Sequence, residues 1–163
     1  MLSPIHERDT IIDWVQALPT ALDLAFSLHA PTGLRWEEQG WDELWLSKRI
    51  KHFFTDLDRK ALGAANRRKH LHIDRVVVLH QSPNVGWHAH CQVTTPKRMS
   101  QDQLASLAER LWLRSLGPHA VGKFQQRLFW SEPVVAGHLP YMLGHLSKDM
   151  VDWENTLLTC AVT

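Results

Sequence analysis

The sequence lacks any apolar run that approaches the roughly 20 residues a membrane-spanning helix needs. Its first residues carry acidic groups where a secretory signal would carry a basic patch and an apolar stretch, so we expect a cytoplasmic protein with no membrane partner. Only two cysteines occur, Cys91 and Cys160, and their wide separation argues against a disulfide framework. We predict two reduced thiols, with Cys91 packed in a strand.

The chain also lacks an excess of charge of either sign, since its formal net charge is +1. Taken alone, this balance argues against a nucleic-acid partner. Basic residues nevertheless gather in residues 47–80, which hold nine Lys or Arg against three Asp. Such a patch can neutralise several phosphates, although a solvated helix face followed by a basic loop explains it equally well. The members for which we predict DNA contacts are Lys48, Arg49, Arg67, Arg68 and Lys69, and outside this patch Gln92 is a further predicted DNA contact.

A length of 163 residues predicts one domain over 1–163, with a core over about 22–149 and an acidic extension over 1–20. Hydrophobic spacing divides the core into strands and helices, joined by loops such as residues 64–70. The predicted strands cover 22–28, 72–81, 87–95 and 126–135, and the predicted helices cover 41–63, 100–117 and 137–148.

This order predicts an α+β fold with a central antiparallel β-sheet. Its β-α-β-β-α-β succession is that of ferredoxin-like (RRM-like) folds, with an added C-terminal helix that would carry a catalytic residue. Ser100 and Gln103 have the spacing of a capping box and mark the start of the second helix.

A His-x-His triplet is the clearest candidate for chemistry. Strand alternation puts His88, His90 and Gln92 on one face, where neighbouring positions lie roughly 6.5–7 Å apart, so both imidazoles can bind one metal ion. In a chain with eleven histidines, a pair without function is the competing interpretation. His80 lies across the predicted hairpin from His88 if the connecting loop has an odd number of residues, and is one candidate for a third ligand.

Tyr141 is the only tyrosine, whereas tryptophan occurs eight times. On a helix, His145 and Lys148 follow it at spacings that share one face. His145 is therefore the other candidate for the third metal ligand, and spacing alone does not separate it from His80. Lys148 is a candidate for stabilising phosphate charge, and an exposed tyrosine and lysine at a helix end are the alternative.

The segments WHAHCQVTTP, QRLFWSEPV and LPYMLGHLSKD, in this order, resemble the HUH endonuclease superfamily over about residues 22–149. The likeness is to small rolling-circle replication initiators of phages, plasmids and related mobile elements, and to single-tyrosine HUH transposases. It implies that His88 and His90 bind one Mn²⁺ or Mg²⁺ ion and that Tyr141 is the nucleophile. The sequence departs from the pattern at Ala89, a usually bulky position, and at His145, which replaces a second tyrosine and favours that histidine as a ligand.

The resemblance implies a single-strand DNA endonuclease and ligase that forms a 5′-phosphotyrosine intermediate, in replication or transposition. Histidine-rich coordination favours manganese over magnesium. The DNA partner is expected to be single-stranded, with a hairpin or origin sequence as its target, and a host helicase or polymerase would supply unwinding and synthesis. The sequence makes no prediction of oligomeric state.

Two other classes compete with this interpretation. The first is a non-catalytic module of the same fold that binds single-stranded nucleic acid without cutting it. A metal-dependent hydrolase of the isopeptidase kind is the second alternative, because Ser100 and Asp102 follow the His-x-His triplet, but their spacing is too short for that pattern.

Overall fold

The computed structural model describes residues 4–31, 42–83, 86–117, 128–144 and 149–158. Within these ranges, five strands form one antiparallel sheet in the order β4-β1-β3-β2-β5. The strands are β1 (Leu24–His29), β2 (Arg75–Ser82), β3 (Gly86–Val93), β4 (Phe129–Pro133) and β5 (Asp149–Val151). The helices are α1 (Pro4–Gln16), α2 (Glu43–Leu62), α3 (Ala64–Lys69), α4 (Gln101–Leu116) and α5 (His138–Leu143).

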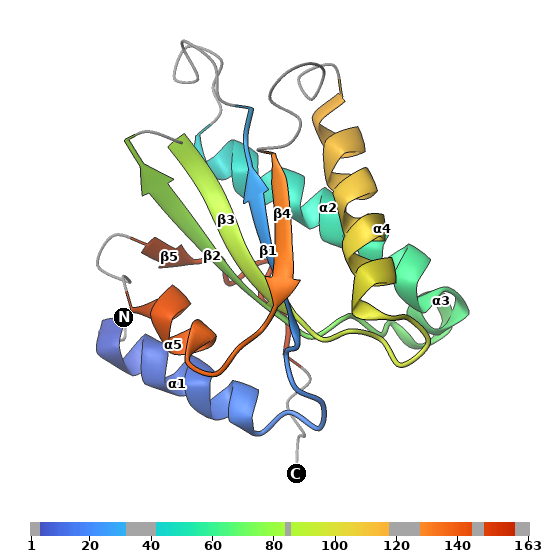
Figure 1. Ribbon diagram of the computed structural model, residues 1–163, viewed down its shortest axis with the longest axis horizontal. Helices are drawn as coiled ribbons and strands as arrows, with labels where there is room; N and C mark the ends of the chain where they lie inside the picture. Colours follow the sequence, from blue (N-terminus) through green and yellow to red (C-terminus); the bar gives the residue numbers. More distant parts are fainter. Residues whose placement is uncertain (1–3, 32–41, 84–85, 118–127, 145–148, 159–163) are drawn as a thin grey trace.

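Helices cover both faces of the sheet (Figure 1). On one face, α2 and α4 bury a large apolar cluster against inward residues of the central strands, among them Ala89, Cys91 and Val93 of β3. On the other face, α1 and α5 pack against Val76 and Val78 of β2. Because side chains alternate along a strand, the residues of β3 between those of the large cluster project towards the side of α1 and α5.

Both long helices begin and end where local chemistry favours it. The carboxylate of Asp42 accepts a hydrogen bond from the Trp45 backbone N–H at 2.8 Å and caps α2. The predicted capping box between Ser100 and Gln103 is present at the start of α4. Gly63 follows α2 with a φ of +58°, a conformation that favours glycine and ends the helix.

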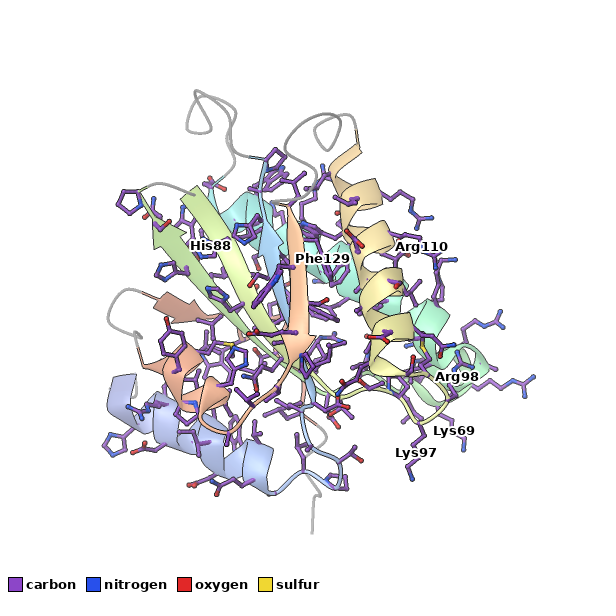
Figure 2. The ribbon with its side chains drawn as sticks, viewed as in Figure 1. Lys69, His88, Lys97, Arg98, Arg110 and Phe129 are labelled. Atoms are coloured by element: carbon purple, nitrogen blue, oxygen red, sulfur yellow. The ribbon has the colours of Figure 1, made fainter. Side chains whose placement is uncertain are left out.

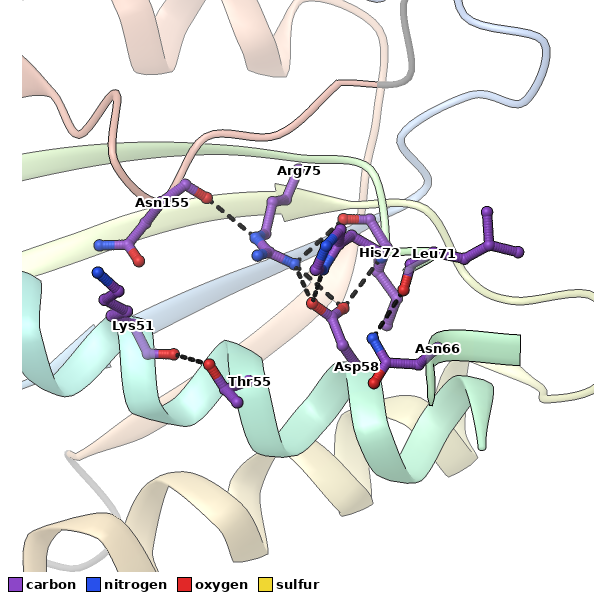
Figure 3. A network of polar contacts seen from close by, with 9 residues as sticks. Lys51, Thr55, Asp58, Asn66, Leu71, His72, Arg75 and Asn155 are labelled. Atoms are coloured by element: carbon purple, nitrogen blue, oxygen red, sulfur yellow. Dashed lines mark hydrogen bonds and ion pairs between the residues drawn. The ribbon is translucent and has the colours of Figure 1, made fainter. Parts of the chain in front are cut away.

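A buried ion pair joins α2, β2 and the segment after β5 (Figure 3). Asp58 and Arg75 are 1% and 4% exposed, and Arg75 Nη1 donates to both carboxylate oxygens of Asp58. The same carboxylate accepts from the Ile73 backbone N–H at 2.9 Å and lies 2.9 Å from His72 Nδ1. Arg75 Nε donates to the Asn155 carbonyl. Both charges are thus paired and hydrogen-bonded, which is what burial of charge requires.

The predicted α+β class and antiparallel sheet are confirmed, and so is the buried position of Cys91 in a strand. The predicted loop at 64–70 is wrong, because Ala64–Lys69 form the short helix α3. The last helix is shorter than predicted, since it covers only His138–Leu143. Helix α1 and strand β5 were not predicted at all. No helix within the described ranges is long and apolar enough to cross a membrane.

Candidate functional site

Four histidines from three adjacent strands gather on the sheet face that α1 and α5 share. His29 ends β1, His80 lies on β2, and His88 and His90 lie on β3. The register places His88 directly between His29 on one side and His80 on the other. The predicted alignment of His80 with His88 is therefore observed, and His29 adds an imidazole that the sequence interpretation overlooked. We call these four side chains the histidine cluster.

His88 is the centre of the histidine cluster. Its ring centroid lies 4.9 Å from that of His29, 4.8 Å from that of His80 and 5.0 Å from that of His90. It is buried, and its Nδ1 lies 3.2 Å from the Gly86 carbonyl oxygen. Because a carbonyl only accepts, Nδ1 donates in this contact, which fixes the orientation of the ring. A backbone carbonyl orients many metal-binding histidines in this way.

Burial holds two members of the histidine cluster in the neutral form. The pKa of His29 is lowered from 6.5 to about 4 by burial and then by the neighbouring His88. The pKa of His90 is likewise lowered to about 4, mainly by burial and also by the nearby histidines. His90 Nδ1 lies 3.2 Å from the hydroxyl of Ser27 on β1. Neutral imidazoles are the form that binds metal ions, so near pH 7 these two rings need not lose a proton first.

The donor chemistry of the histidine cluster fits a divalent transition metal. Two imidazoles that bind one ion at about 2.1 Å have ring centroids about 5 Å apart, close to the separations around His88. The ring nitrogens do not point to one common position. Within the described ranges, no three His, Cys, Asp or Glu side chains are placed so that they could hold a metal ion. Side-chain rotation of His80, His88 and His90, or a further ligand, is needed to complete a coordination sphere.

Tyr141 and His90 line one cavity of about 260 Å³. Tyr141 is 72% exposed on α5, while Leu139, Met142 and Leu143 of the same helix pack against the sheet. Helix packing thus fixes the position of the Tyr141 backbone, and the exposed phenol is accessible to a large substrate. The structure brings Tyr141 and the edge of the histidine cluster together at this cavity.

The other predicted site residues lie elsewhere. His145 and Lys148 fall outside the described residues. Gln92 lies on the histidine face, as predicted, but it is only 1% exposed, which leaves it no surface for DNA. Its Nε2 has no hydrogen-bond partner among the described residues.

The predicted basic patch does not adjoin the histidine cluster. Arg67, Arg68 and Lys69 are exposed on α3, and Figure 2 shows Lys69 at the opposite end of the molecule from His88. Lys48 is exposed on α2, whereas Arg49 donates to the Ser115 carbonyl at 2.8 Å and so ties α2 to α4. Lys48 and Arg49 thus lie on a helix that covers the far face of the sheet, and the other three lie on the short helix that follows it.

Sequence reasoning missed His29 of the histidine cluster and several residues that line the cavity. Ser27 and His29 continue the alternation of Ala25 along β1, a signal that was present but was not connected to the triplet. Trp130 and Glu132 alternate along β4 and also line the cavity, as does His138 of α5. The position of those three residues at the cavity follows only from the strand pairing and the helix packing.

No known protein family matches this sequence, and no curated protein matches it. Among solved structures, the chain is similar to the N-terminal nuclease domain of non-structural protein 1 from minute virus of mice. The similarity covers 93% of this chain and 73% of that chain, with 11% sequence identity and a TM-score of 0.35. That domain is described as having Zn²⁺ in its active-site pocket and as recognising DNA at the origin of replication. At this identity and TM-score, the likeness assigns neither a family nor a function to the chain.

Proposed function

We propose that the chain is a metal-dependent enzyme of the HUH type, which nicks single-stranded DNA and transfers or rejoins the cut strand. The observation that carries the proposal is the histidine cluster, with the only tyrosine of the sequence lining the same cavity as His90. A group of histidines, two of them held neutral by burial, beside an exposed phenol suits phosphodiester transesterification better than it suits a structural core.

His80, His88 and His90 are the described residues that would hold the ion, with His145 as a further candidate. A bound Mn²⁺ or Mg²⁺ ion would supply Lewis-acid polarisation of the scissile phosphate, and nitrogen ligands favour manganese. His88 stands at the centre of this set, and its Nδ1 contact with the Gly86 carbonyl would hold its ring in one orientation. His29 lies against the other side of His88 and would limit the movement of its ring.

Tyr141 would act as the nucleophile. Its phenolic oxygen forms a bond to phosphorus while the bond from phosphorus to the 3′ oxygen of the preceding nucleotide breaks. The phenolic proton passes through solvent to the departing oxygen, so the products are a free 3′-hydroxyl and a 5′-phosphotyrosine. One phosphorus–oxygen bond replaces another, and a 3′-hydroxyl can therefore reverse the step and join strands. Lys148 is proposed to stabilise charge on the phosphate, as the sequence interpretation suggested.

The position of α4 weakens the isopeptidase alternative. Ser100 caps α4, and the helix packs on the sheet face opposite the histidine cluster. The hydroxyl is hydrogen-bonded to the Gln103 backbone N–H at 3.1 Å as part of the capping box. Neither Ser100 nor Asp102 is among the residues that line the cavity of Tyr141.

Several wider assignments belong to the same proposal. The chain is proposed to form a single endonuclease domain with a ferredoxin-like strand order extended by β5, and to act in the cytoplasm. Its DNA target would be a single-stranded origin or hairpin of a mobile element, phage or plasmid. A host helicase or polymerase would act with it in replication or transposition.

The test is the formation of a protein–DNA adduct that survives denaturation. Purified protein is incubated with labelled single-stranded DNA from a random-sequence pool, with Mn²⁺, with Mg²⁺ or with chelator. We expect an adduct and a nicked product in metal, and neither with chelator, Tyr141→Phe or His88→Ala. His52→Ala, which changes an exposed histidine of α2, is the matched control and should retain activity. Binding of the pool without an adduct under any condition would favour a non-catalytic binding module and contradict the proposal.

A further inference from the structure

An exposed tryptophan stands beside the cavity that Tyr141 and His90 line. Trp130 lies on the edge strand β4, opposite Ser27 of β1, and is 54% exposed. Its neighbour Phe129 is buried in the large apolar cluster, so β4 is anchored by one aromatic and presents the other. An exposed indole face on a sheet is a surface on which unpaired bases stack.

The cavity beside Trp130 also presents polar groups. Glu132 follows Trp130 by two residues on β4, and its Oε1 lies 3.5 Å from His138 Nε2. His138 Nδ1 is buried with no hydrogen-bond partner among the described residues. Ser27 contributes a hydroxyl at the side of His90. A flat aromatic wall beside a few hydrogen-bonding groups is typical of a site for a small heteroaromatic ring.

We propose that this cavity binds one unpaired nucleobase of single-stranded DNA, stacked on Trp130 with its edge towards Glu132 and His138. The volume of about 260 Å³ admits a single base rather than an extended strand. The inference rests on the proposed substrate, single-stranded DNA, and not on the cutting step. The Glu132 carboxylate only accepts hydrogen bonds, so an edge that places the exocyclic amino group of cytosine against it is favoured over uracil, which presents a carbonyl oxygen at the same position.

The experiment measures binding in the Tyr141→Phe background, where cutting is prevented. Fluorescent oligo(dC), oligo(dU) and an abasic oligomer of equal length are titrated by anisotropy. Trp130→Ala is expected to weaken oligo(dC) binding roughly tenfold or more, since base stacking contributes that much, and to change abasic binding less than about twofold. Trp130→Phe should retain most of the affinity. Glu132→Gln should remove the preference for oligo(dC) over oligo(dU).

Trp14→Ala is the matched control, because Trp14 is 41% exposed on α1 and does not line the cavity. Thermal melting confirms that each variant is folded. The inference is overturned if Trp130→Ala leaves oligo(dC) binding unchanged, if it weakens abasic binding equally, or if the parent shows no preference for oligo(dC). Base-selective binding in this background, together with no covalent adduct on the protein that keeps Tyr141, supports the inference and ends the proposed nicking function. An adduct on the Tyr141 protein with unaltered binding by Trp130→Ala ends the inference alone.

Discussion

Removal of Asp58 is predicted to destabilise the protein more than any surface substitution. In Asp58→Ala, the guanidinium of Arg75 loses its counter-ion while 4% exposed, and the Ile73 backbone N–H loses its acceptor. Breaking a buried ion pair by removing one partner costs about 3–5 kcal/mol. At about 2–4 °C per kcal/mol for a chain of this size, the melting temperature should fall by about 6–20 °C.

Asp56→Ala is the matched control on the same helix. Asp56 pairs with Arg59 at 2.6 Å and with Arg114 at 3.1 Å, which are as short as the contacts of Asp58, but both arginines are more than half exposed. Surface pairs contribute about 0–1 kcal/mol, so this variant should unfold almost as the parent does. Urea and thermal unfolding followed by circular dichroism measure both variants. Equal losses of unfolding free energy in Asp56→Ala and Asp58→Ala would refute the reasoning that burial determines how much an ion pair contributes to stability.

Three further predictions concern the site and the thiol beneath it. The pKa values of His29 and His90 are about 4 in the fold against 6.5 when unburied, so the unfolded chain binds more protons between these values. The free energy of unfolding should therefore fall as pH drops from about 6.5 to about 4, by up to about 3 kcal/mol per histidine, and a fall of the same size in His29→Ala would count against this. Mn²⁺ at a hundred times its dissociation constant should stabilise the parent by about 2.7 kcal/mol, and His88→Ala should abolish that thermal shift; a persistent shift would place the ion elsewhere. Burial raises the pKa of the Cys91 thiol, so in a Cys160→Ser background a thiol reagent should label the chain only after unfolding, and rapid labelling of the native chain would show that Cys91 is accessible.

Local signals predicted the parts of the fold that depend on local physics. The three- and four-residue spacing of Ile50, Phe53, Phe54 and Leu57 predicts α2, because these side chains form the stripe that the helix buries. The capping box predicts where α4 begins. Alternation along β3 predicts which face carries His88, since a strand has no other way to place successive side chains.

Long-range contacts explain what the sequence left open. His29 meets His88 only because β1 pairs with β3 across more than fifty residues, and its own segment shows no sign of that partner. The short helix α3 was missed because the AANRRK segment buries no residue and has no apolar stripe to detect. The sequence does not show that Trp130 is exposed at the site. That position follows from the sheet order, which places β4 at the edge beside α5.

The most direct test of the central claim is to identify the atom that carries the DNA. The protein is allowed to react with single-stranded DNA in Mn²⁺, and the adduct is digested and sequenced by mass spectrometry, with parallel strands labelled at either end. The account predicts a nucleotide joined through its 5′ phosphate to the oxygen of Tyr141, with the 3′-labelled part of the strand retained on the protein. An adduct on any other residue, or retention of the 5′-labelled part instead, would contradict it.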